Sequence, residues 1–238
     1  MPRMWIFNSG SRLVRADRRQ DALEHLIQRA HAIHGGELAL LTVVADHRRR
    51  LLVVHRQPLA HGYIAACKLI VLQLEIDIET VYYAIEFGTK HGIPVLLNPA
   101  PADPNLDLDR VKDCTYLMPN ETELALLTGM PVESEEEIEA AARKLLDAGI
   151  KDVIVTLGSR GALWVNGEAA KRYQGEKVDA VDTTGAGDAF IGCFSHVLVQ
   201  TGDIDTAITI ANRYAADSVT RRGTQTSFAT AEEFGLEI

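Results

Sequence analysis

The sequence predicts an α/β fold with a mostly parallel central sheet over residues 68–238. Short apolar runs alternate there with longer segments that repeat apolar residues at helical spacing. Strands that alternate with helices pair in parallel through right-handed crossovers. The chain has 238 residues, of which 47% are hydrophobic, and this is enough for one large α/β domain with or without a small appendage.

The expected elements follow one another without an internal repeat or a low-complexity segment. In chain order they are a strand at 69–75, a helix at 78–92, a strand at 94–98, a short helix at 105–114, a strand at 115–120 and a helix at 120–130. A helix at 134–150, a strand at 152–158, a hairpin formed by 161–167 and 169–175, and two long helices at 185–202 and 203–223 complete the series. Asn120 is well placed to cap its helix, and Ser134 and Glu137 have the spacing of a capping box.

Residues 1–67 differ from the rest of the chain and form a separate, atypical N-terminal segment. They hold ten arginines, no lysine and five acidic residues, a balance of +5, whereas residues 68–238 carry a balance of −14. A helix at 18–36 and strands at 37–45 and 50–56 are the expected elements here. We expect this N-terminal part to be truncated or aberrant, either because the reading frame is shifted or because the segment has genuinely diverged.

Composition excludes several classes of protein. The net charge of −9 disfavours nucleic acid as the main ligand, and no apolar run approaches the roughly 20 residues that span a membrane. Three scattered cysteines, Cys67, Cys114 and Cys193, lack the spacing of a zinc site or of a disulfide framework. We therefore expect a cytoplasmic protein with no membrane or nucleic-acid partner and with reduced cysteines in its core.

A glycine-rich turn that leads into an apolar helix gives the strongest chemical signal, in the stretch DTTGAGDAF at 182–190. Gly185 and Gly187 permit close approach to the backbone, and the free amides of a helix start can hold a phosphoryl group. A lone GxG is more often an ordinary helix start than a ligand site. Asp188, however, lies in the first turn, where its carboxylate could take the proton of an attacking alcohol.

The stretch DTTGAGDAFIG resembles the C-terminal signature of the ribokinase-like (PfkB-type) carbohydrate kinases. NPAPADP, PNETE and SVTRRGTQTS occur in the family's order, and within the family they are most similar to ribokinase and deoxyribokinase. The resemblance runs from about Leu69 to the C-terminus and implies a three-layer ribokinase-like fold. It makes Asp188 the catalytic base that also contacts the sugar and the nucleotide, and it makes Gly185, Ala186 and Gly187 the anion hole.

The resemblance also implies further site residues. Asn120 would lie near the nucleotide phosphates, Glu123 would organise magnesium through water, and Glu75 would contact the sugar. The nucleotide site would be lined by Thr156, Leu157, Gly158, Ser159, Arg160, Gly161, Gly187 and Asn212. A monovalent cation would be held by a loop containing Asp182, Thr184, Ser218, Arg221, Gly223 and Ser227, mostly through backbone carbonyls. For Asn120 taken alone a simple helix cap is an equal alternative, but the PNETE context favours the role near the nucleotide.

The implied activity is ATP-dependent phosphoryl transfer to the primary hydroxyl of a pentose, with ATP, Mg²⁺ and K⁺ as cofactors. Ribose is the expected sugar and deoxyribose its nearest alternative. The family's sugar-binding aspartate and its GGKGANQA-like segment are not recognisable. The Gly35-Gly36 pair does not match that segment, because it is followed by Glu37-Leu38. An inactive nucleotide-binding fragment and a kinase for a non-sugar acceptor are therefore alternatives, and a homodimer is the assembly that the resemblance allows.

Overall fold

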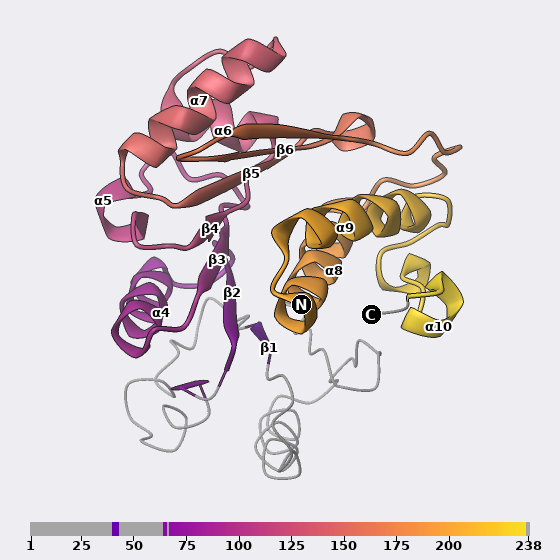
Figure 1. Cartoon of the computed structure of the whole chain (residues 1–238), viewed down its shortest axis with the longest axis horizontal. Coiled ribbons are helices and arrows are strands. Elements are labelled where there is room, and N and C mark those ends of the chain that lie inside the picture. Colours follow the sequence, from indigo (N-terminus) through magenta and orange to yellow (C-terminus); the bar gives the residue numbers. More distant parts are fainter. Residues whose placement is uncertain (1–39, 43–63, 66, 237–238) are drawn as a thin grey trace.

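A seven-stranded sheet forms the centre of the computed structural model, which describes residues 40–42, 64–65 and 67–236. Its strands lie side by side in the order in which they occur along the chain (Figure 1). They are β1 (Leu40–Thr42), β2 (Leu69–Gln73), β3 (Val95–Asn98), β4 (Tyr116–Leu117), β5 (Asp152–Thr156), β6 (Gly161–Asn166) and β7 (Ala170–Gln174). The pairings from β1 to β5 are parallel, and β5, β6 and β7 pair in antiparallel fashion. The predicted mostly parallel sheet and the predicted hairpin are both confirmed.

Helices cover both faces of the sheet. The longer helices are α4 (Ile78–His91), α6 (Glu121–Thr128), α7 (Glu135–Asp147), α8 (Ala186–Thr201) and α9 (Ile204–Ser218), and the short ones are α5 (Leu108–Val111) and α10 (Ala231–Phe234). Ile70 and Leu72 of β2 pack into a core cluster with α4, α5, α6 and α7, whereas Leu69 and Val71 pack into a second cluster with α8 and α9. This alternation is the period of two that a strand imposes, and it gives the three-layer arrangement that the sequence predicts.

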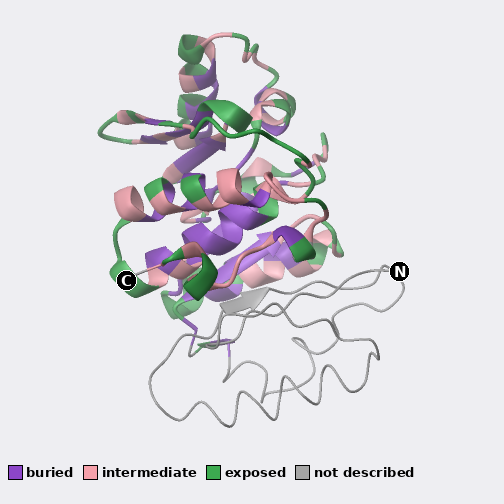
Figure 2. Cartoon of the chain, turned by 90° about the vertical axis from the view of Figure 1, so that its right-hand side faces the viewer, coloured by how far each residue is buried: buried purple, intermediate pink, exposed green. Residues whose placement is uncertain are grey.

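Burial follows the same arrangement. The sheet and α8 are largely buried, while the outer helices expose one side to solvent (Figure 2). In α8, nine residues are buried, among them Phe194, which has no exposed surface. All three cysteines are buried, as expected. Across the described part of the chain, no helix combines the length and apolar character needed to cross a membrane.

Local signals in the sequence place the starts of two helices accurately. Asn120 with Glu123, and Ser134 with Glu137, form the capping boxes that begin α6 and α7. The predicted helix at 105–114 is limited to Leu108–Val111, and the predicted strand at 115–120 to Tyr116–Leu117. Pro119 cannot donate a backbone hydrogen bond, which agrees with the early end of β4.

The N-terminal segment contributes one edge of the sheet. β1 falls within the strand predicted at 37–45 and pairs in parallel with β2, Leu40 lying opposite Leu69. The helix predicted at 18–36 and the strand predicted at 50–56 lie outside the described residues. The division of the chain at residue 67 stays a prediction.

Candidate active site

The candidate anion site is the first turn of α8. Gly185 is its N-cap in the left-handed conformation, with φ 84° and no capping side chain. The amide of Ala186 donates to the carbonyl of Thr183 at 3.2 Å. Those of Gly185, Gly187 and Asp188 meet no acceptor within the described residues. Two of the three predicted donors, together with the amide of Asp188, are therefore available to an anion at the positive end of the helix.

Asp188 lies in this same turn and is exposed at the surface. Its Oδ1 accepts a hydrogen bond of 3.2 Å from Nε2 of Gln73, at the end of β2. Protein atoms around the carboxyl group displace water and raise its pKa, and the bond from Gln73 partly opposes that rise. A carboxylate thus lies beside amides that meet no acceptor in the described part of the chain, at the carboxyl end of a parallel strand, which is where α/β sheets usually bind ligands.

The segments that carry Asn120 and Thr156 lie next to each other. Asn120 and Thr156 form an isolated parallel bridge, and the amide of Thr156 donates to the carbonyl of Pro119 at 2.9 Å. The side chain of Asn120 accepts from the amide of Glu123 and donates to its Oε1, both at 2.9 Å. Burial raises the pKa of the Glu123 carboxyl, and the hydrogen bonds from Asn120 oppose that rise. The capping function of Asn120 is therefore realised, and its nucleotide contact stays a prediction.

The loop from Leu157 to Gly161 follows directly from β5. Leu157 is buried, Gly158, Ser159 and Arg160 form a 3₁₀ turn, and Gly161 begins β6. Arg160 forms an ion pair with Glu121 of α6. This pair links the two segments that the family resemblance places near the nucleotide.

The turn before α8 is tied to the loop after α9. The carboxylate of Asp182 accepts hydrogen bonds from the amides of Gly223, at 2.9 Å, and Thr184, at 3.0 Å. These bonds, with that from Gly223 the strongest influence, lower the pKa of Asp182 to about 2. The amides of Val181 and Asp182 both donate to the carbonyl of Val219. The predicted cation loop is thus brought together from two distant segments.

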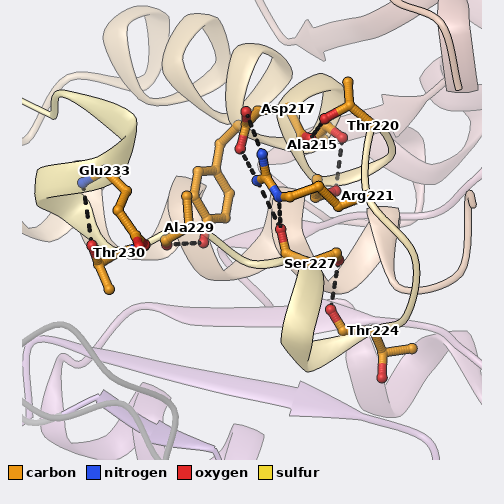
Figure 3. Close-up of polar contacts among 11 residues, drawn as sticks. Ala215, Asp217, Thr220, Arg221, Thr224, Ser227, Ala229, Thr230 and Glu233 are labelled. Atoms are coloured by element: carbon orange, nitrogen blue, oxygen red, sulfur yellow. Dashed lines mark hydrogen bonds and ion pairs between the residues drawn. The ribbon is translucent and has the colours of Figure 1, made fainter. Parts of the chain in front are cut away.

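Arg221 holds the second of these segments in place (Figure 3). Its guanidinium forms an ion pair with Asp217 and donates twice to the carbonyl of Ser227, at 3.0 and 2.8 Å. The carbonyl of Ser227 is therefore already bound, and the Ser227 hydroxyl donates to Thr224. Four other predicted carbonyls accept no hydrogen bond within the described residues: those of Asp182, Thr184, Arg221 and Gly223.

Replacing Arg221 with lysine is expected to loosen this loop. Lysine cannot bind Asp217 and Ser227 with one planar fork, so we expect a loss of about 1 kcal/mol in the free energy of unfolding. Hydrogen exchange at the amide of Ser227 should also accelerate. Arg222→Lys is the matched control, because the exposed Arg222 side chain makes no hydrogen bond with the described residues. Equal effects of the two variants would contradict this assignment.

Two predicted site residues, Glu75 and Asn212, take part in none of these contacts. Glu75, just beyond β2, is exposed and forms no hydrogen bond or ion pair with the described residues. Asn212 is buried on α9. Ser218 is also buried, and its hydroxyl donates to the carbonyl of Ala215. In the described ranges, no group of three or more His, Cys, Asp or Glu side chains could hold a metal ion.

Gln73 and Asn98 are site residues that the sequence did not predict. Both end apolar strands, and their side chains are joined by a hydrogen bond of 3.3 Å. The signal that could have found them is a polar residue directly after a buried run, because the ends of adjacent parallel strands meet at one edge of the sheet.

The sequence profile described as pfkB family carbohydrate kinase matches residues 39–231. The chain belongs to this family. The match begins ahead of Leu69, so it includes β1 and part of the atypical N-terminal segment.

Relatives and solved structures within the family are similar to most of the chain. A deoxyribokinase of Salmonella typhi is 55% identical over 168 residues, which are 71% of this chain and 55% of the relative. A ribokinase of Schizosaccharomyces pombe is 42% identical over 175 residues, 71% of this chain and 54% of the relative. The structure of Arabidopsis thaliana ribokinase complexed with ribose and ATP aligns with a TM-score of 0.70 at 29% identity, covering 74% of this chain and 57% of the other. The chain thus spans about half the length of the curated relatives it matches.

Proposed function

We propose that the chain transfers the γ-phosphoryl group of ATP to the primary hydroxyl of a pentose, with Asp188 as the catalytic base. The observation that supports this most strongly is the start of α8. There a carboxylate lies in the same helical turn as amides that meet no acceptor within the described residues. Phosphoryl transfer depends mainly on positioning and charge stabilisation, and these are what this turn can supply.

The residues at the turn fit a bound phosphate. A Cβ placed on Gly187 would meet no atom within 4 Å, so the space beside it is open. The amides of Gly185, Gly187 and Asp188 would hold the oxygens of the phosphoryl group, which ATP supplies when bound. Oδ2 of Asp188, which accepts no hydrogen bond within the described residues, would take the proton of the sugar hydroxyl.

The two ions have candidate ligands as well. The unbound carbonyls of this loop are oxygen ligands of the kind that K⁺ prefers, and they belong to Asp182, Thr184, Arg221 and Gly223. Glu123 places a buried carboxylate beside Asn120, where it could orient water around Mg²⁺. Burial of the Glu123 carboxylate fits an indirect role in metal binding better than direct coordination.

Ribose is the proposed acceptor, and 2-deoxyribose is the second candidate. The relatives' names support both sugars, and the higher identity to a deoxyribokinase, 55% against 42% for a ribokinase, favours testing deoxyribose equally. ADP release should be measured with the purified chain, Mg²⁺, K⁺ and ATP, with ribose, with 2-deoxyribose and without sugar. Sugar-dependent release supports the proposal.

Two other results would contradict it. ATP binding to folded protein without turnover on either sugar would indicate a nucleotide-binding chain without kinase activity. Turnover only with a non-sugar alcohol would mean that the chain phosphorylates a different class of acceptor.

A further inference from the structure

We propose that Gln73 is a positioning residue for Asp188, and that its side-chain orientation is set by Asn98 and the backbone carbonyl of Met118. This inference rests on the proposed role of Asp188 and adds a device that controls it. The hydrogen bonds between these residues cross the carboxyl ends of β2, β3 and β4 and reach the first turn of α8.

The carbonyl of Met118 determines which group donates and which accepts in each hydrogen bond of this series. The carbonyl of Met118 can only accept, so the group of Asn98 that lies 2.8 Å from it must be the Nδ2 amide. The Oδ1 of Asn98 must then face Gln73, and it accepts from Nε2 at 3.3 Å. Gln73 therefore presents its NH₂ group, and not its carbonyl, to the carboxylate of Asp188.

Burial at the fixed end makes the arrangement rigid. Asn98 is only 7% exposed and Met118 only 1%. Turning the amide of Asn98 over would place its oxygen against the carbonyl of Met118 and leave buried polar atoms without hydrogen bonds, which is costly. The donor that faces Asp188 is thus set from the interior of the sheet.

The consequence for Asp188 is twofold. A fixed donor on Oδ1 holds the carboxylate plane and leaves Oδ2 for the substrate hydroxyl. The same hydrogen bond favours the ionised carboxylate and so opposes the rise in pKa that desolvation causes. A base must be ionised to accept a proton, so loss of the bond should weaken catalysis most at low pH.

Among the described residues, no other side chain opposes the rise in the pKa of Asp188. No charged side chain among the described residues adds to the two causes of its shifted pKa, neither Glu75 beyond β2 nor Asp182 before α8. The amides at the start of α8 come from the same helix as Asp188 and would bind the phosphoryl group. Gln73 is therefore the side chain to test.

The first experiment measures the pKa of Asp188 directly. The side-chain carboxyl resonance of ¹³C-labelled aspartate would be followed against pH and assigned through its loss in Asp188→Asn. Gln73→Met keeps the length of the side chain but removes the donor, and we expect it to raise the pKa of Asp188 by about 0.5–1. Gln73→Glu, which places a second carboxylate there, should raise it further. Gln200→Met, at the far, exposed end of α8, is the matched control and should change nothing.

A measurement on the unaltered chain guards against variants that fail to fold. If the bond exists, the side-chain NH₂ resonances of Gln73 should shift with the same midpoint as the carboxyl of Asp188. A flat response, or an unchanged pKa in folded Gln73→Met, would overturn the proposal. Neither readout requires turnover, so both remain informative if the chain shows no kinase activity and the proposed function fails.

The kinetic readout separates positioning from general stability. In an active chain, Gln73→Met should lower kcat by about 10- to 100-fold at neutral pH. The KM for ATP should stay the same, and the acidic limb of the kcat profile should move to higher pH. A purely structural role would lower the folded fraction without moving that limb. An unmoved limb in folded protein would therefore contradict the proposed role of Gln73.

Discussion

Asp188→Asn is expected to lower sugar-dependent ADP release by about 10³-fold, while ATP binding changes little. Asparagine keeps the size of the side chain and can still accept from Gln73 through its oxygen, but it cannot take a proton from an alcohol. The amides of Gly185 and Gly187 remain available to the phosphate. The measurement combines steady-state turnover with calorimetric titration of ATP.

A matched control separates this effect from a general change in charge. Asp179→Asn removes one carboxylate from an exposed position in the segment before α8, where it forms no hydrogen bond or ion pair with the described residues. We expect near-normal turnover for this variant. If Asp188→Asn kept more than about a tenth of the activity, Asp188 could not be the base, because general base catalysis contributes about 10²-fold or more.

Gly161→Ala is expected to lower the free energy of unfolding by about 3 kcal/mol. Gly161 has φ 95°, and a Cβ there would lie 2.2 Å from the carbonyl oxygen of Tyr173 and 2.5 Å from the amide nitrogen of Gly175. These are backbone atoms of β7 and of the residue that follows it, so the clash can be relieved only by opening the hairpin. Chemical denaturation followed by circular dichroism measures the loss.

Gly167→Ala is the control within the same hairpin. Gly167 lies outside the positive-φ region, and a Cβ placed there would meet no atom within 4 Å. We expect a change within about 0.5 kcal/mol. Equal free energies of unfolding for the two variants would contradict the close contact between β6 and β7 at Gly161. The positive φ and the close contact with the opposite strand thus favour glycine at position 161, whether or not a nucleotide binds there.

Local signals account for most of the fold that the sequence predicts. Capping residues such as Asn120 and Ser134 mark helix starts because their side chains bond to amides only two or three positions away. The alternation of Leu69, Ile70, Val71 and Leu72 between two core clusters follows from strand geometry alone. These features depend on neighbours in the sequence, and a single sequence therefore contains them.

Contacts between distant segments account for what the sequence does not predict. Gln73 and Asp188 are separated by 115 positions, and no local pattern pairs them. The link between Asp182 and Gly223 spans 41 positions, and the resemblance grouped these two residues without giving the bond. Arg221 was expected as a cation-site residue, but its position also shows that it binds the carbonyl of Ser227. Such pairings arise from the packing of α8 and α9 on the sheet.

Phosphoryl transfer can be followed directly through the phosphorus atoms. The chain would be incubated with ATP, Mg²⁺, K⁺ and ribose or 2-deoxyribose and observed by ³¹P nuclear magnetic resonance. We predict that the γ-phosphate signal of ATP is replaced by that of a primary phosphate ester, coupled to the two protons of the sugar C5, and only when sugar is present. Free inorganic phosphate alone, or unchanged ATP in the presence of folded, ATP-binding protein, would contradict phosphoryl transfer to a pentose.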